Sequence, residues 1–117
     1  MTMKNQRRFI RFDTEDFINI RPLNNVNIVC GATSKNIGLV GVCFYAPQRW
    51  EKGELLLIDY FIIPQSALAR LKTRVVWSEL IDAQKGYLIG VEVLKIEENE
   101  EAFLKYYFQK VKETFLE

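Results

Sequence analysis

The stretch SALARLKTRVVWSELIDAQKGYLIGVEVLKI, residues 66–96, decides the fold class. Four side chains of one predicted strand face recur at every second position: Leu71, Thr73, Val75 and Trp77. The tetrapeptide AQKG that follows them is typical of a hairpin turn, and YLIGVEVLKI predicts the returning strand. SALARL alone would also suit a helical turn, but the β-branched residues after it favour a strand. The stretch therefore predicts a long antiparallel hairpin.

Several shorter strands are predicted before this hairpin. Alternation in DTEDFINIRPL (13–23) and in NNVNIVCGATS (24–34) predicts two half-buried strands. Their apolar positions are Phe17, Ile18 and Ile20 in the first, and Val26, Ile28 and Cys30 in the second. LVGVCFYAP (39–47) and ELLLIDYFIIP (54–64) are apolar runs closed by proline, with a turn around Gly53 between them. The pattern is that of an all-β domain.

The end of the chain changes from strand to helix periodicity. Apolar side chains recur at offsets of three and four: Leu104, Tyr107, Phe108, Val111 and Phe115. We expect Asn99 to cap the first turn and Tyr106, which lies off this stripe, to be exposed. The fold class is therefore mainly β: a small antiparallel β-barrel of about six strands followed by a C-terminal α-helix. We expect a single domain over residues 1–117, with a flexible arginine-bearing arm (1–16), the barrel (17–96) and the helix (97–117).

Composition excludes several classes of function. Sixteen Lys and Arg against fifteen Asp and Glu give a net charge of +1, which argues against a general nucleic-acid coat. The chain has no histidine, so a histidine-based nucleophilic site cannot be built, and no metal-binding spacing is visible. Cys30 and Cys43 are read as buried free thiols, although a disulfide is not excluded. With no signal peptide and no apolar run of membrane-spanning length, we expect a cytoplasmic protein without membrane insertion.

Two motifs stand apart from this regular pattern. Arg7, Arg8 and Arg11 crowd into five positions beside Phe9 and Phe12. The segment Asn36-Ile37-Gly38-Leu39-Val40-Gly41 follows at the next glycine-rich turn. Together they resemble the R-x-x-x-R and (D/N)-x-S-x-x-G motifs of the PilZ domain, the bacterial receptor module for cyclic di-GMP, except that Gly38 stands in place of the family serine. The resemblance covers nearly the whole chain.

The resemblance implies a ligand site and a function. The c-di-GMP-binding residues would be Arg7, Arg8, Arg11, Asn36, Gly38 and Gly41. Guanidinium groups suit phosphodiester oxygens and guanine faces, and the Asn36 amide can engage a guanine edge. We expect a non-enzymatic receptor with no metal or other cofactor, whose arm closes on the ligand and signals to a protein partner in motility, pili, adhesion or exopolysaccharide control. Oligomeric state and ligand stoichiometry stay open.

Purely structural interpretations also fit the residues of both motifs. The arginines alone would suit a solvated terminus, and Asn36 with its glycines suits an ordinary turn. A degenerate PilZ-like module that does not bind nucleotide is the main alternative function, since Gly38 removes a hydroxyl worth roughly 0.5–1.5 kcal/mol. An OB-type nucleic-acid binder fits the balanced charge poorly. We expect Asp13, Glu15 and Asp16 to lie in a solvated loop, and Trp50 and Trp77 to serve in packing.

Overall fold

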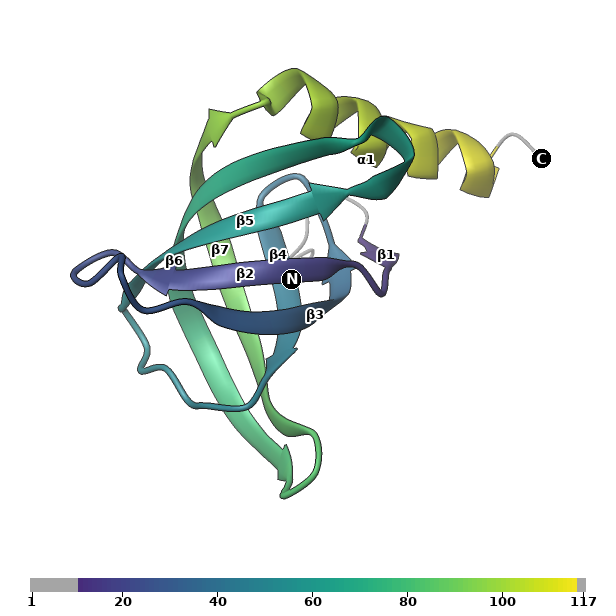
Figure 1. Cartoon of the computed structure of the whole chain (residues 1–117). Coiled ribbons are helices and arrows are strands. Elements are labelled where there is room, and N and C mark those ends of the chain that lie inside the picture. The colour runs from purple at the N-terminus through teal and green to yellow at the C-terminus, as the bar shows by residue number, and fades with distance from the viewer. Residues whose placement is uncertain (1–10, 116–117) are drawn as a thin grey trace, which may run out of the picture.

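The structure, a computed structural model, describes residues 11–115 (Figure 1). Its strands are β1 (Phe12–Asp13), β2 (Phe17–Pro22), β3 (Cys30–Ile37), β4 (Gly41–Ala46), β5 (Leu55–Ile62), β6 (Ala67–Asp82) and β7 (Gly86–Glu98). A short 3-10 helix, η1 (Ile63–Gln65), precedes β6, and the helix α1 (Glu100–Phe115) follows β7. The predicted fold class, a small antiparallel barrel with a C-terminal helix, is confirmed.

Six antiparallel strands close the barrel in the order β3-β2-β5-β6-β7-β4, and β4 returns to pair with β3. The short β1 adds to the end of β3 beyond the part that pairs with β2. Side chains from all six strands fill the interior, and the largest fully buried ones include Ile18, Ile37, Phe44, Ile58, Tyr60, Leu71 and Ile89. Phe103 of α1 joins this core, so the helix covers part of the barrel near β5 and β6 (Figure 1).

The long hairpin of β6 and β7 forms as predicted, and its register shifts at four places. The pairing shifts between Val75 and Trp77, because Val76 is an extra residue opposite a single residue of β7. Leu71, Thr73 and Val75 are buried as expected, but the bulge turns Trp77 outward, where it is 42% exposed. The regular alternation therefore ends at Val75, and Trp77 lies on the outer face of the hairpin.

The predicted strand over 24–34 begins later than expected. Val26 and Ile28 are about half exposed and lie in the loop before β3, which begins at Cys30. Backbone hydrogen bonds from Asn25 to Pro22 and from Ile28 to Asn25 form consecutive tight turns in this loop. The asparagine-rich sequence favours turns over extended backbone, which explains the difference.

The helix also departs from its predicted details. Tyr106 is buried and Phe108 is 53% exposed, the reverse of what the apolar stripe suggested. Asn99 lies directly before α1, but its backbone is left-handed (φ 56°) and its side-chain amide donates to the Leu68 carbonyl at 2.6 Å. The side chain is therefore used to attach the helix to β6 and does not cap it. Both cysteines are free thiols, as favoured from the sequence.

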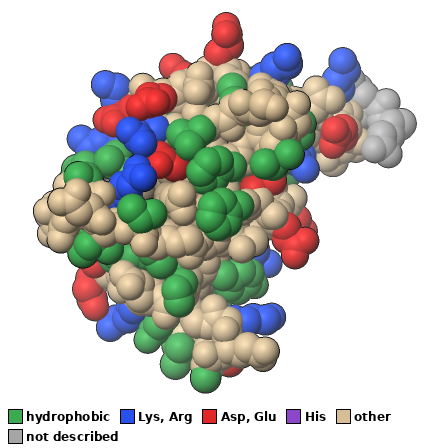
Figure 2. Space-filling model, viewed as in Figure 1, with side chains coloured by type: hydrophobic (Ala, Val, Ile, Leu, Met, Phe, Trp, Pro, Cys, Tyr) green, Lys and Arg blue, Asp and Glu red, His purple; other side chains and the backbone are tan. Residues whose placement is uncertain are grey.

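One face of the barrel carries mixed apolar and charged side chains. Figure 2 shows hydrophobic side chains gathered on the face turned toward the viewer, with a cluster of basic and acidic side chains beside them. On this outer side of β2 and β5, the rings of Phe17 and Phe61 lie 5.4 Å apart. The Asp59 carboxylate is buried between the guanidinium groups of Arg21 and Arg70, each at 2.8 Å. Because both arginines are paired within the molecule, this cluster serves to hold the three strands together.

Candidate functional site

The described start of the chain is held along the end of β3. Phe12 pairs with Ile37, and the Thr14 amide donates to the Lys35 carbonyl at 2.9 Å. The Phe12 ring is buried against Tyr107 of α1 at 5.4 Å in an edge-on contact. These contacts fix the residue that precedes them, Arg11, beside the turn between β3 and β4.

Arg11 meets the second motif at this turn. Its guanidinium Nη1 donates to the Asn36 side-chain oxygen at 3.3 Å, although the two residues are 25 positions apart. An ideal Cβ on Gly41 would lie 2.8 Å from Arg11 Nη2, so only a glycine leaves room for the guanidinium group in this position. One arginine of the first motif and both ends of the second therefore converge.

The motif itself forms the tight connection from β3 to β4. The Gly38 amide donates to the Gly41 carbonyl at 2.8 Å, and the Val40 carbonyl accepts from the Val93 amide of β7 at 2.9 Å. Gly38 is buried within this connection. The turn is thus held by backbone hydrogen bonds and does not need the serine hydroxyl that the family motif has here.

A second glycine shapes the neighbouring surface. Trp77 pairs with Gly90 across β6 and β7, and an ideal Cβ on Gly90 would lie 2.4 Å from two atoms of the indole ring. The indole therefore lies directly on the bare backbone of β7. Gly41 of β4 and Gly90 of β7 lie on the outer surface of adjacent strands. The Arg11 guanidinium group covers Gly41, and the Trp77 indole covers Gly90.

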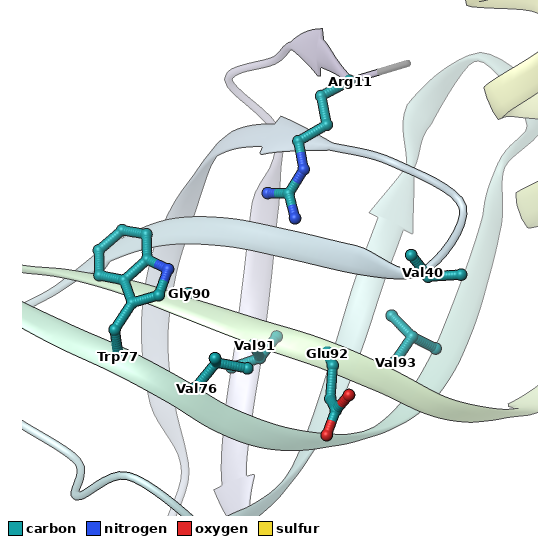
Figure 3. A pocket seen from close by; sticks show the side chains of 8 residues that line it. All are labelled: Arg11, Val40, Val76, Trp77, Gly90, Val91, Glu92 and Val93. Atoms are coloured by element: carbon teal, nitrogen blue, oxygen red, sulfur yellow. The ribbon is translucent and has the colours of Figure 1, made fainter. Parts of the chain in front are cut away.

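A pocket of about 370 Å³ opens between these two side chains (Figure 3). It is lined by Arg11, Val40, Val76, Trp77, Gly90, Val91, Glu92 and Val93. Its walls combine one guanidinium group, one indole ring, aliphatic side chains and one carboxylate. Such a set can bind a flat, partly apolar molecule that also carries negative charge.

A hydrogen-bonded cluster behind the arm joins it to the rest of the molecule. The Asp16 carboxylate accepts from the hydroxyls of Tyr60 (β5) and Tyr106 (α1), both at 2.6 Å. Ser34 of β3 completes the cluster, because its hydroxyl accepts from the Asp16 amide at 2.9 Å and lies 2.7 Å from the Thr14 hydroxyl. The expectation that Asp16 lies in a solvated loop is therefore wrong: its carboxylate connects the arm to α1.

Burial and this carboxylate change the acidity of both tyrosines. Removal from water raises the pKa of Tyr60 well above its usual range, and the hydrogen bond to Asp16 adds to the shift. The pKa of Tyr106 is raised for the same two reasons, with burial the larger. Both phenols therefore remain protonated donors throughout the physiological pH range.

The structure brings together four of the six residues predicted from the motifs: Arg11, Asn36, Gly38 and Gly41. Arg7 and Arg8 lie outside the described residues, and so does Phe9. Sequence reasoning missed Trp77, Gly90 and Glu92 as parts of the pocket. The sequence assigned Trp77 to packing, because the bulge that turns its side chain outward leaves no recognisable pattern in the sequence.

Within residues 11–115, no three Cys, Asp or Glu side chains gather in a way that suits a metal ion. No helix in this same part of the chain combines the length and the apolar character needed to cross a bilayer.

The described residues form a small closed barrel with Arg11 placed against Asn36 and Gly41 at its β3–β4 turn. The sequence model of the PilZ domain matches residues 5–110, and the chain belongs to this family. The family is one of receptors and effectors related to cyclic di-GMP. No match was found among the curated proteins.

Solved structures share the fold at low sequence identity. The Bacillus subtilis inhibitor of motility, MotI/DgrA, is similar with a TM-score of 0.76 and 16% identity over 96% of this chain, which spans 54% of that protein. The PilZ domain of YcgR from Escherichia coli, solved with c-di-GMP, has a TM-score of 0.67 and 12% identity, covering 94% of this chain and 97% of that one. The PilZ domain of CeSA from a cellulose-synthesizing bacterium has a TM-score of 0.60 and 12% identity, with 86% and 96% covered.

Proposed function

We propose that this chain is a receptor for cyclic di-GMP. The observation that carries the proposal is the meeting of Arg11 and Asn36 over Gly41, at the edge of a pocket that also holds Trp77. Membership of the PilZ family and the fold shared with a domain solved with c-di-GMP support the same ligand.

The chemistry of the ligand suits the side chains in the pocket. Cyclic di-GMP carries two phosphodiesters and two guanines, so it needs positive charge and flat surfaces. Arg11 supplies a guanidinium fork for phosphate oxygens or for a guanine face, and we propose that Arg7 and Arg8 add to it. The Trp77 indole, 42% exposed on the pocket wall, offers a stacking surface. Asn36, Gly38 and Gly41 would form the turn against which the ligand rests.

Signalling would follow from the arm rather than from catalysis. We infer that the ligand draws the arginine arm (residues 1–16) onto the 17–96 barrel and so changes the surface offered to a protein partner. Control of motility, pili, adhesion or exopolysaccharide is the process expected of such a receptor. Because the ligand is a bacterial second messenger made in the cytoplasm, the proposal places the chain there.

Calorimetric titration with c-di-GMP tests the proposal. Arg11→Ala should weaken binding about tenfold or more, since a charged hydrogen bond contributes about 1.5–3 kcal/mol. The matched control is Arg49→Ala, because Arg49 is an exposed arginine in the loop after β4, outside the pocket lining, and pairs with Glu51 at 3.1 Å. The control should bind like the wild type. Equal affinity in Arg11→Ala and wild type would remove Arg11 from the site.

The second candidate is a PilZ-like module that acts through protein contacts and binds no nucleotide. Gly38 favours it, because the family serine and its hydroxyl are absent. The same titration separates the two candidates: a wild-type protein without measurable affinity for c-di-GMP supports the second.

A further inference from the structure

The pocket contains one acidic side chain, Glu92, that neither motif includes. Its carboxylate is 48% exposed, and Arg74 Nε approaches one oxygen at 3.5 Å. That separation is longer than the usual 2.7–2.9 Å of a charge-assisted hydrogen bond. A carboxylate can accept several hydrogen bonds, so Glu92 keeps most of its acceptor capacity for a ligand.

The register of the barrel places this carboxylate beside the other binding groups. Glu92 pairs with Gly41 of β4, the glycine on which the Arg11 guanidinium lies. It is two residues from Gly90 on the same face of β7, and the Trp77 indole lies on Gly90. At a rise of about 3.4 Å per residue, Glu92 is about 7 Å from that point along the strand. A base stacked against the indole can therefore reach the carboxylate with its edge.

The chemistry of guanine matches this carboxylate. The Watson–Crick edge of guanine presents two adjacent donors, N1–H and the N2 amino group, and a carboxylate accepts both. Adenine presents the N1 lone pair at the corresponding place, which a carboxylate repels. The family motif allows an aspartate at its first position, but this chain has Asn36, whose side-chain oxygen already accepts from Arg11.

We propose that Glu92 is the residue that selects guanine, supplying from β7 the carboxylate that position 36 lacks. The inference rests on the proposed c-di-GMP function and adds the basis of its base specificity.

The test is calorimetric titration of the wild type, Glu92→Gln and the control Glu79→Gln with c-di-GMP and with c-di-AMP. Glutamine keeps the shape of the side chain but has one acceptor oxygen and no charge. We expect Glu92→Gln to lose about tenfold or more in c-di-GMP affinity and to lose most of the preference for c-di-GMP over c-di-AMP. Glu79, exposed on β6 and not part of the pocket lining, should be replaceable without effect.

The outcomes separate this inference from the function on which it rests. A Glu92→Gln protein that binds c-di-GMP as tightly as the wild type, or more tightly, overturns the role of Glu92 and leaves the receptor function in place. Tighter binding would show that the carboxylate only repels the phosphodiesters. A wild type that binds neither dinucleotide overturns both proposals. Thermal unfolding of each variant checks that the barrel is intact.

Discussion

Two glycines determine where the basic and the aromatic side chains of the pocket can lie. Gly41 leaves the space that the Arg11 guanidinium group occupies, and Gly90 leaves the space under the Trp77 indole. The two differ in what a methyl group would displace. Near Gly41 it is first the flexible end of an arginine, with the Val91 carbonyl oxygen next at 3.1 Å, whereas near Gly90 it is a rigid ring. Substitution of Gly41 therefore separates ligand binding from stability.

Gly41→Ala should weaken c-di-GMP binding about tenfold while the free energy of unfolding stays within about 1 kcal/mol of the wild type. The added Cβ would lie 2.8 Å from Arg11 Nη2, so the guanidinium group must leave Asn36. Calorimetry measures the affinity and denaturant unfolding measures the stability.

A glycine elsewhere in the barrel provides the control for this prediction. Gly31→Ala places a methyl group 3.3 Å from the Phe17 ring, on a part of β3 outside the pocket lining. It should bind c-di-GMP as the wild type does. A Gly41→Ala protein with unchanged affinity would show that the observed position of Arg11 is not needed for binding.

Among the elements, the helix α1 is joined by Asp16 to the segment that precedes β2. Tyr106 lies 90 residues from Asp16 in the sequence, and its hydroxyl donates to this carboxylate. The hydroxyl of Tyr60 in β5 donates to the same carboxylate. The helix is therefore attached to the same short segment that positions Arg11. Any ligand that reorganises this segment acts on α1 through one hydrogen-bonded cluster.

Tyr106→Phe should destabilise the protein by about 1–2 kcal/mol, because it removes a hydrogen bond to a carboxylate while Tyr60 still satisfies Asp16. Denaturant unfolding gives the change. The control is Tyr45→Phe, since the half-buried Tyr45 contacts Lys85 only through its ring. Equal stability of the Tyr106→Phe and Tyr45→Phe proteins would contradict a structural role for the Tyr106 hydroxyl.

At the scale of the whole molecule, β3 closes the barrel and carries the site. It pairs with β1, β2 and β4, and its residues contribute Ser34 to the buried cluster and Asn36 to the hydrogen bond with Arg11, which lines the pocket. The interior of the barrel is apolar apart from a few polar groups that form hydrogen bonds, and Tyr60 carries the largest of these side chains. Global stability should therefore respond to the ionisation of the buried phenols.

Stability should fall as the pH rises above about 10, the usual pKa of tyrosine. Because the folded state raises the pKa of Tyr60 and Tyr106, the unfolded chain releases protons that the folded chain keeps. The stabilisation is complete below pH 10 and is lost above it, by up to about 1.4 kcal/mol per pH unit for each tyrosine. Unfolding midpoints between pH 9 and 11 should decline less steeply in Tyr106→Phe than in the wild type. Parallel curves would contradict the shift at Tyr106.

Local patterns in the sequence are enough to predict the fold class and several residues of the candidate site. Period-two alternation, the turn at AQKG and the change to helical spacing after Asn99 are local signals, so they predicted the barrel and its helix. The two motifs likewise predicted Arg11, Asn36, Gly38 and Gly41 as a group. The spacing of apolar residues failed at Val26, where the asparagine-rich sequence favours turns, and at Tyr106, whose burial depends on contacts with the distant Asp16 and Tyr60.

The other side chains that join the motifs become visible once the strands are paired in three dimensions. Trp77 and Glu92 reach the pocket because of the bulge at Val76 and the pairing of β4 with β7. A shift of one residue in either register would turn these side chains to the opposite face. Such registers are set when the barrel closes and its core packs, and no short stretch of the sequence contains that information.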